Sequence, residues 1–468
     1  MKRLFIILVC LIPLFTGCEK ETDPLPAKVT PEQKSPAKVA TPETVTPPLT
    51  MKHLLQEGIE ATLVEVPTQA LPIWRKYREQ KPTLVLYSRD PFLAPTPAAL
   101  EEEAIELIQD GASDKLSERL LFPSSNPLLL PDMALDSALR TEVFSRVVWV
   151  FPAKVPIDQL DGELVPQQLL ELGAIDQEEA KTFVYAKGVA SGTVQGLPFK
   201  AVHPDALPTL QGPVVLHIDL GFFQPLYKGE IKTPLYPLLY KTMSDIAKLG
   251  WQGVCATLSF SNTSSGLPLS IRFIGPTLAR LLSEPGLLDA QLPANWARRA
   301  NVLYLPNFFK TEEINKLYQE MDSADPENPS IKFGYYQVSR QLKSGNKALE
   351  LLAQAVALDP VYALEYPLLS SVAMEKGRPL EAVQMLHHAR AAQPDNPFIA
   401  LQLANLLIQI KHPEQAIKIL KDLDRHPWSE TYFPEMSAQL VALMTAAKES
   451  GTNVGQDKSL SLPEEKEQ

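Results

Sequence analysis

Two hydrophobic patterns divide the chain. From about residue 51, short continuous apolar runs alternate with stretches in which apolar positions recur every three or four residues. The first pattern predicts buried strands and the second predicts helices. From about residue 327 only the helical spacing remains. The chain is therefore expected to fold as an α/β region followed by an all-α region.

The predicted strands of the first region are Thr83–Tyr87, Arg146–Phe151, Pro213–Ile218, Gly253–Phe260 and Asn301–Leu305. Helical patterns lie between them at residues 97–111, 236–250 and 275–284. Strands that alternate with helices favour a mainly parallel sheet, and continuous apolar strands favour a sheet covered on both faces. We therefore expect a three-layer α/β domain over residues 51–310.

A period of 34 residues marks the second region. Three alanines and three prolines each keep this interval: Ala348, Ala382 and Ala416, and Pro326, Pro360 and Pro394. Each block contains two short amphipathic helical stretches. This closely resembles the tetratricopeptide repeat, in which small residues let paired helices pack and a proline ends each unit. The resemblance implies an α-solenoid of repeats over residues 311–448, with a connector and a closing helix. Residues 449–468 are polar and are predicted to form a disordered tail.

The first eighteen residues have the pattern of an export signal. Lys2 and Arg3 precede an apolar stretch, Leu4–Phe15, that is too short for a comfortable transmembrane helix. Small residues and Cys18 follow. The segment resembles the bacterial lipoprotein signal, which implies lipidation of Cys18; an ordinary secretory signal cleaved nearby is the alternative. Glu19 stands where an aspartate would resemble an inner-membrane retention signal, so we expect the periplasmic side of the outer membrane in a Gram-negative cell envelope.

Residues 19–50 contain seven prolines and no aromatic residue. Such a segment buries too little apolar surface to fold, and its prolines favour an extended chain. It is predicted to be a disordered tether between the lipid anchor and the folded regions.

Composition removes several classes of function. The net charge of −11 gives no electrostatic reason to expect a nucleic acid partner. Of the three cysteines, Cys10 falls in the signal, Cys18 is the lipidation site and Cys255 lies in an apolar strand. The sequence therefore predicts no disulfide framework and no paired-cysteine zinc site.

Candidate chemistry lies where two predicted strands end. The stretch GPVVLHIDLGFF, residues 212–223, carries His217 and Asp219, and the stretch Val66–Phe92 ends near Asp90. The carboxyl ends of parallel strands often hold ligands or catalytic groups. Over roughly residues 55–305, these stretches resemble the arginase/deacetylase fold of metal-dependent hydrolases. That resemblance implies a cluster of carboxylates and imidazoles around a water-activating metal ion.

The residues depart from that family's motif. Asp219 matches its first aspartate, but Gly221 replaces the second, and no histidine stands at the ligand position beside Asp90. His217 falls where the family has a serine. Asp90, His217 and Asp219 are therefore predicted to form a vestigial or altered metal or ligand site. The favoured alternative is that Asp219 hydrogen-bonds a loop and His217 is a satisfied core histidine.

The predicted function is a lipid-anchored, extracytoplasmic scaffold that binds a protein or peptide partner in the groove of its repeats. Phe333 and Gln337 stand where carboxylate-gripping members of the repeat family have lysine and asparagine, so an apolar and aromatic groove is expected. Tyr335, Tyr336 and Tyr366 are its candidate residues, and at least one of them is expected to pack in the core instead.

The α/β region is then predicted to be catalytically inactive, with no catalytic residue, metal ligand or cofactor assigned. One alternative is a metal-dependent C–N bond hydrolase of arginase/deacetylase type, which would use Mn²⁺ or Zn²⁺. Another is a pseudoenzyme that binds a ligand without turning it over.

Overall fold

The computed structural model describes residues 51–261 and 267–452, which belong to one compact unit spanning residues 48–468. The predicted signal with Cys18, the tether and the chain beyond residue 452 lie outside the described residues. None of the helices in the described ranges is both long enough and apolar enough to cross a bilayer.

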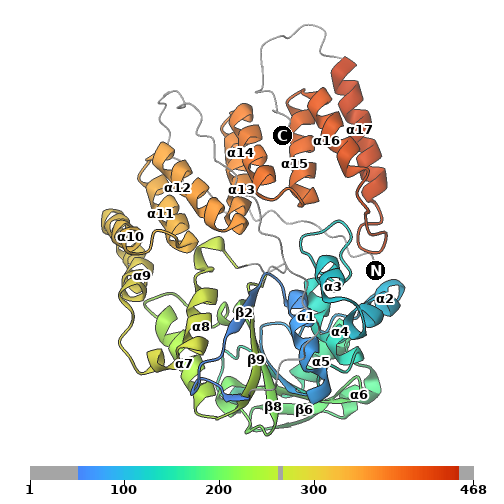
Figure 1. Cartoon of the computed structure of the whole chain (residues 1–468), viewed down its shortest axis with the longest axis vertical. Coiled ribbons are helices and arrows are strands. Elements are labelled where there is room, and N and C mark those ends of the chain that lie inside the picture. Colours follow the sequence, from blue (N-terminus) through green and yellow to red (C-terminus); the bar gives the residue numbers. More distant parts are fainter. Residues whose placement is uncertain (1–50, 262–266, 453–468) are drawn as a thin grey trace. The chain divides into compact units, whose positions relative to one another are not determined.

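A mixed sheet of nine strands forms the first half of the described chain (Figure 1). The strands are β1 (Lys52–His53), β2 (Ala61–Val64), β3 (Thr83–Tyr87), β4 (Arg146–Val150), β5 (Val184–Ala186), β6 (Val189–Val194), β7 (Leu197–Val202), β8 (Pro213–Asp219) and β9 (Gln252–Ser259). Their order is β1-β9-β8-β3-β4-β7-β6-β5, and β2 also pairs with β9. The pairs from β2 through β9, β8, β3 and β4 to β7 are all parallel, and β1, β5 and β6 add antiparallel pairs.

Two hairpins at one edge of the sheet were missed by the sequence prediction. Gln195 and Gly196, between β6 and β7, have φ angles of 52° and 75°. Lys187 and Gly188, between β5 and β6, have φ angles of 49° and 81°. Two consecutive positive φ angles are characteristic of the tight turns that join antiparallel strands, and glycine at the second position favours them. The pairs Lys187-Gly188 and Gln195-Gly196 were the sequence signal that could have predicted these two turns.

The helices of this half are α1 (Leu71–Trp74), α2 (Ala98–Gln109), α3 (Ser113–Arg119), α4 (Ala134–Arg140), α5 (Leu164–Leu172), α6 (Gln177–Lys181), α7 (Leu235–Ala247), α8 (Ile274–Ser283) and α9 (Ala294–Tyr304). Figure 1 shows α7 and α8 on one side of strands β2 and β9, and α1, α4 and α5 on the other. In β3, Leu84 and Leu86 enter one buried cluster, and Val85 and Tyr87 enter another. Because successive strand residues point to opposite faces, both faces of the sheet are buried.

The predicted strand at Asn301–Leu305 is wrong, because these residues end helix α9 and begin the turn after it. Arg299 and Val302, three residues apart, form the buried side of the helix. A short apolar run does not distinguish a buried strand from the end of a buried helix, and here the helical spacing upstream decided the outcome. The strands predicted at 83–87, 146–151, 213–218 and 253–260 are confirmed within one or two residues.

Eight helices follow: α10 (Thr311–Ala324), α11 (Pro329–Gln341), α12 (Gly345–Leu358), α13 (Glu365–Glu375), α14 (Pro379–Ala392), α15 (Pro397–Gln409), α16 (Pro413–Leu423) and α17 (Met436–Thr452). The second helices of three successive pairs, α12, α14 and α16, begin 34 residues apart. Ala348, Ala382 and Ala416 are buried where these helices pack against their partners. Helix α17 packs on α16 and extends into the predicted tail.

The repeats differ in how their first helices begin. Asn328 and Asn396 cap α11 and α15 by accepting backbone N–H groups from the first turn. The middle repeat has a 3₁₀ turn, Pro360–Leu364, before α13, and this turn buries Tyr362. The aromatic ring of Tyr362 lies 4.8 Å from that of Phe333, so the irregular turn is packed into the first repeat.

Both ends of the repeat array bond to the α/β half. At the first repeat, the Arg299 guanidinium donates to the backbone oxygen and the hydroxyl of Ser330 at 3.3 and 3.1 Å. Beyond α16, the hydroxyl of Tyr432 donates to the backbone oxygen of Leu128 at 3.1 Å, and the Ser429 N–H donates to the Ser125 carbonyl at 3.0 Å. These bonds hold the solenoid to the α/β half at two separated points.

Candidate functional site

A buried polar cluster lies at the carboxyl ends of β8 and β9. His217 pairs in register with Thr257, and Asp219 with Ser259. Because alternate residues of a strand share a face, all four side chains point to the same side of the sheet. His217 is 0% exposed and Asp219 is 1% exposed. The register thus brings together two of the residues predicted as a site and adds two hydroxyls that the sequence analysis did not assign.

The hydrogen bonds of the cluster form one continuous chain. Trp74 Nε1 donates to Thr257 Oγ1 at 3.0 Å, which lies 2.8 Å from His217 Nδ1. His217 Nε2 lies 3.1 Å from Ser259 Oγ, and Ser259 donates onward to Asp219. While Asp219 is ionised, Ser259 donates its proton to the carboxylate, so His217 Nε2 carries a proton and donates to Ser259, and Nδ1 accepts from Thr257. Every polar atom of the imidazole is therefore satisfied in the neutral state.

Burial shifts the two titratable groups in opposite directions. It lowers the pKa of His217 to about 3, because the imidazolium would lose its hydration. Burial also raises the pKa of Asp219 to about 7, against the opposing hydrogen bonds from Ser259, Ser261 and the Gly221 N–H. The nearby Asp90 carboxylate adds to the rise. The cluster disfavours charge on both groups.

Gly221 is explained by the close approach of the chain to Asp219. Its N–H donates to Asp219 Oδ1 at 2.9 Å. A Cβ on residue 221 would lie 2.7 Å from Asp219 Oδ1 and 2.9 Å from Ser261 Oγ, closer than carbon and oxygen normally approach. A carboxylate side chain, as in the resembled hydrolases, has no room here.

Asp90 lies on an exposed turn, near enough to Asp219 to affect its pKa but not bonded to it. Its backbone oxygen accepts the hydroxyl of Ser88. Across the described parts of the chain, no three His, Cys, Asp or Glu side chains gather as metal ligands would. The Cys255 thiol is buried on the same face of the sheet, and burial raises its pKa to about 12. The structure therefore does not bring these residues together as a metal centre.

The three tyrosines predicted to line the repeat groove are all buried in the repeat core. Tyr335 stacks on Tyr318 and bonds Lys347, whereas Tyr336 donates to Glu365 at 2.7 Å. Tyr366 packs its ring 5.4 Å from that of His388. Here the structure differs from the prediction, because these side chains fill the space between helices rather than an open surface.

A polar face replaces the expected aromatic groove. On α13, Leu368, Ser371 and Glu375 point outward, and the same positions 34 residues later on α15 are Gln402, Asn405 and Gln409. Residues at spacings of three, four and seven share one side of a helix. We call these six residues the amide face. Leu368 is 58% exposed and is the large apolar side chain within it.

The amide face begins at the second repeat. The corresponding position of the first repeat is Gly334, which is buried, and a Cβ there would collide with Tyr318 of α10. Helix α10 therefore covers the first repeat at this position. Gln402, Asn405 and Gln409 form no side-chain hydrogen bond with any other described residue. Their amide groups are free to donate to and accept from another chain. The 34-residue interval was the signal that would have found them.

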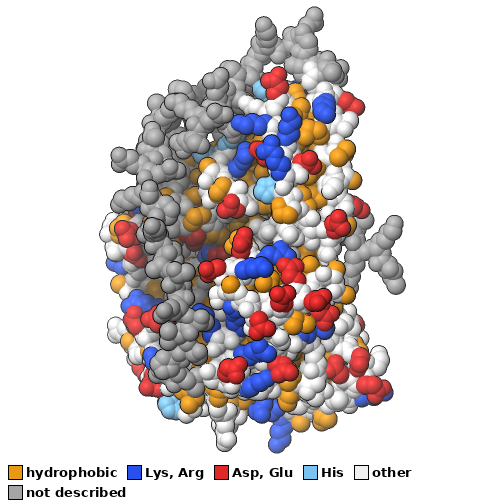
Figure 2. Space-filling model, turned by 45° about the vertical axis from the view of Figure 1, so that its right-hand side comes forward, with side chains coloured by type: hydrophobic (Ala, Val, Ile, Leu, Met, Phe, Trp, Pro, Cys, Tyr) orange, Lys and Arg blue, Asp and Glu red, His pale blue; other side chains and the backbone are white. Residues whose placement is uncertain are grey.

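The surface carries both signs of charge. Figure 2 shows acidic and basic side chains interspersed over the face that it draws. Many of them pair within one helix, as Arg280 does with Glu284 and Lys241 with Asp245. The prediction that the chain binds no nucleic acid remains a prediction.

Comparison with known proteins identifies the repeats. Residues 373–426, from the end of α13 to just beyond α16, match the family model described as a tetratricopeptide repeat. The resemblance seen in the sequence is thus confirmed for this part of the chain, which contains tetratricopeptide repeats. The match covers too little of the chain to give a family for the whole protein. No curated protein matches the chain.

Several solved structures overlap with about a third of the chain. The crystal structure of MamA protein shares 15% identity, covers 36% of this chain and 98% of its own, and has a TM-score of 0.22. PilF of Pseudomonas aeruginosa shares 18% identity over 35% of this chain and 78% of its own, with a TM-score of 0.21. The APC/C hetero-tetramer Cut9-Hcn1 shares 15% identity over 36% of this chain and 35% of its own, with a TM-score of 0.22. Scores this low carry no argument about function.

Proposed function

We propose that this chain is a protein-interaction scaffold that binds an extended segment of a partner protein along the amide face. The proposal rests on the row of three side-chain amides on α15, Gln402, Asn405 and Gln409. They are unpaired among the described residues, and the packed repeat core holds them outward. An extended peptide presents N–H and C=O groups in need of partners, and asparagine and glutamine supply both donors and acceptors. Leu368 adds an apolar contact beside them.

The proposed partner contact is tested by site-specific photo-crosslinking of the full chain in cells. A photo-reactive residue at position 368 or 409 should crosslink one defined protein. The same residue at Gln319, which is exposed on α10 and is not one of the six residues of the amide face, should not. The combined change Gln402→Ala, Asn405→Ala and Gln409→Ala should abolish co-purification of that protein, whereas Gln319→Ala should leave it unchanged. Equal crosslinking from both surfaces would refute the amide face as the contact.

We further propose that Cys18 is lipidated and that the scaffold works outside the cytoplasm, at the cell envelope. Support comes from the basic start, the apolar stretch and the small residues before the cysteine. Two acyl chains give stable membrane attachment where one gives only reversible binding. Metabolic labelling with a radioactive fatty acid should label the wild-type chain and not Cys18→Ser. Labelling of both proteins would contradict the anchor.

We propose that the α/β half supports the scaffold and does not catalyse hydrolysis. His217, predicted to belong to a vestigial or altered metal or ligand site, is fully buried, and both of its ring nitrogens are hydrogen-bonded, to Thr257 and Ser259. The test is metal content and Mn²⁺ or Zn²⁺ binding by the purified full chain. Stoichiometric metal that is lost in Asp219→Ala would overturn this proposal and revive the hydrolase alternative.

A further inference from the structure

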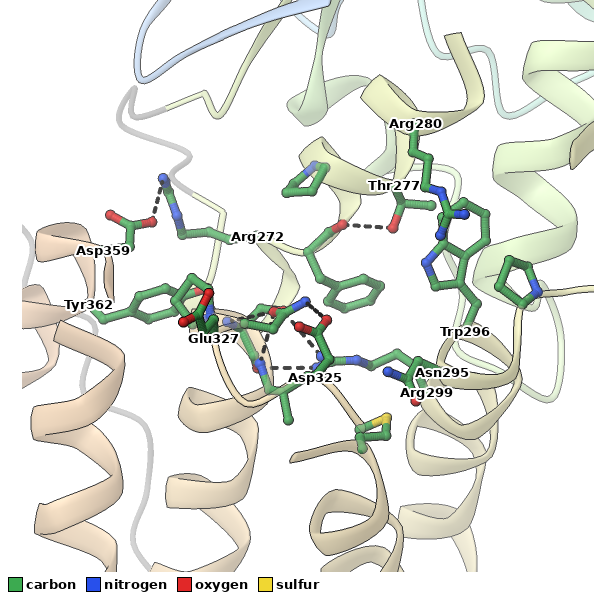
Figure 3. A pocket seen from close by; sticks show the side chains of 18 of the residues that line it. Arg272, Thr277, Arg280, Asn295, Trp296, Arg299, Asp325, Glu327, Asp359 and Tyr362 are labelled. Carbon is green, nitrogen blue, oxygen red and sulfur yellow. Dashed lines mark hydrogen bonds and ion pairs between the residues drawn. The ribbon is translucent and has the colours of Figure 1, made fainter. Parts of the chain in front are cut away.

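A pocket of about 440 Å³ lies where the last helices of the α/β half meet the first repeat. Its walls come from α8 and α9, from the turn before α11 and from the turn before α13. Figure 3 shows Arg280 and Trp296 at one end of the pocket and Arg272, Asp359 and Tyr362 at the opposite end. The volume is in the range of small-molecule sites.

Two buried arginines line this pocket, and only one of them has a counterion in the part of the chain that the structure describes. The Arg272 guanidinium, in a residue 7% exposed, donates to both carboxylate oxygens of Glu65 at 2.9 and 2.6 Å. Asp359 lies 3.6 Å from it. Arg299 is 5% exposed, and within residues 51–261 and 267–452 its guanidinium hydrogen-bonds to Ser330 alone, whose oxygens are neutral. Among the described residues, no carboxylate lies within ion-pair distance of Arg299.

Two aromatic rings also lie beside the Arg299 guanidinium. Its guanidinium carbon lies 4.7 Å from the ring centre of Phe273 and 5.6 Å from that of Tyr318. Two hydrogen bonds use only part of the five N–H donors of a guanidinium. Aromatic faces stabilise a cation, but they do not accept those remaining donors as an oxygen does. A buried charge without a counterion is costly, and an anionic ligand would relieve that cost.

The walls around Arg299 suit an apolar or aromatic group. Tyr236 and Trp296 stack with ring centres 5.9 Å apart and planes 28° apart. Arg280, which is already paired with Glu284, lies over the same Trp296 ring at 5.6 Å. The pocket therefore combines an unpaired cation with flat aromatic surface, the two features that bind a carboxylate attached to a ring.

The pocket also carries negative charge. Asp325 and Glu327 line it on the side of the turn before α11, and Asp325 accepts from Asn328 at 2.9 Å. These two carboxylates would repel a phosphate dianion more strongly than they would repel a ligand with a single carboxylate group. The charge balance thus favours a monoanion.

We propose that this pocket binds a small organic monoanion, an aromatic or strongly apolar carboxylate. Its carboxylate accepts hydrogen bonds from the Arg299 N–H groups that do not bond to Ser330. Its apolar part lies against Trp296 and Tyr236. The chemistry is shared by a free aromatic acid and by the carboxyl terminus of a peptide that ends in an aromatic residue. This site is separate from the amide face and does not depend on the proposed scaffold function.

Calorimetric titration of the full chain with phenylacetate tests the proposal. We expect saturable one-to-one binding, no binding of the neutral phenylacetamide, and at least tenfold weaker phenylacetate binding in Arg299→Met. The matched control is Arg298→Met, the neighbouring arginine, which pairs with Glu320 at 3.2 Å and does not line the pocket. Lack of saturable binding by the wild-type chain, equal binding of the amide, or unchanged binding by Arg299→Met would each overturn the proposal.

Arg299 also joins α9 to α11, so its replacement tests folding as well as binding. Thermal unfolding followed by circular dichroism shows whether Arg299→Met keeps the wild-type midpoint. Trp296→Leu provides a second variant that leaves every bond of Arg299 in place. It should weaken phenylacetate binding at least fivefold while acetate binding changes less. Equal loss for both acids, or no loss for either, would contradict the aromatic wall.

The source of the carboxylate is resolved by a second pair of probes. A short peptide that ends in phenylalanine is titrated with a free carboxyl terminus and with an amidated one. Preference for the free peptide over phenylacetate identifies a peptide terminus as the ligand class, and the reverse order identifies a free acid. Binding of the amidated peptide as tightly as the free one would refute a role for Arg299 in carboxylate recognition.

Discussion

The hydroxyl of Ser259 donates to the carboxylate of Asp219 over 2.5 Å, and the same oxygen lies 3.1 Å from His217 Nε2. One serine thus links two groups whose pKa values are shifted in opposite directions by the same burial. Between about pH 4 and 6.5 the folded cluster carries its proton on Asp219, whereas the unfolded chain carries it on His217. The number of bound protons is equal, so the two linkage effects largely cancel in the wild-type chain.

Asp219→Asn should reveal the pH dependence of stability that comes from His217 alone, because it removes the contribution of Asp219. The raised pKa of Asp219, about 7, means that its contribution to stability is fully present below about pH 4 and is lost as the pH rises through 7. Asparagine has no charge and resembles the protonated acid: its oxygen can accept from the Gly221 N–H, and its N–H group can donate to the Ser259 oxygen. The free energy of unfolding of the variant, relative to wild type, should rise by roughly 4 kcal/mol between pH 4 and 8. Urea unfolding across this range measures it, with the exposed Glu102→Gln as control; a flat difference would contradict the buried carboxylate.

His217→Gln should show the opposite slope. The lowered pKa of His217, about 3, means that its contribution is present above about pH 6.5 and is lost as the pH falls toward 3. Relative to wild type, the variant should gain roughly 3 kcal/mol between pH 7 and 4, on top of a constant packing loss against Trp74. The same urea titrations apply, with His53→Gln, an exposed histidine, as the matched comparison. Parallel pH profiles for wild type and His217→Gln would show that His217 does not titrate as proposed.

Gly221→Ala should destabilise the fold by about 1–3 kcal/mol, because the new methyl group would be forced against Asp219 and Ser261. Gly345→Ala is the control, since a Cβ at this first residue of α12 meets nothing within 4 Å. That change should leave stability unchanged or raise it by up to about 1 kcal/mol. The denaturant midpoints of the two variants, compared with that of wild type, measure these effects on stability. Equal midpoints for both variants would mean that residue 221 has room for a side chain.

Arg272→Gln should lower the free energy of unfolding by about 2–3 kcal/mol, because it removes the bidentate ion pair with Glu65 at a partly buried position. The comparable change Arg280→Gln removes an exposed pair with Glu284 and should cost less than about 0.5 kcal/mol. Thermal and urea unfolding of both variants measure the difference. A similar cost for both arginines would show that burial of the Arg272 pair contributes nothing.

Local patterns in the sequence were enough to identify the periodic elements. The 34-residue interval of Ala348, Ala382 and Ala416 follows from the geometry of stacked helix pairs, in which a small residue must recur where helices cross. Continuous β-branched runs likewise predicted β3, β4, β8 and β9, because strands buried on both faces need apolar residues at every position. These features depend on neighbours along the chain, which a sequence displays directly.

Only the tertiary structure decided which side chains meet. Register between β8 and β9 set His217 against Thr257 and Asp219 against Ser259, pairs separated by 40 residues. Packing of helix α10 on the first repeat decided where the amide face begins, and packing of the repeat core buried Tyr335, Tyr336 and Tyr366. The sequence could not indicate Arg299 as a candidate residue, because its lack of a counterion depends on which side chains the fold places around it. Such relationships are set by the free energy of the whole packed chain, so no local pattern contains them.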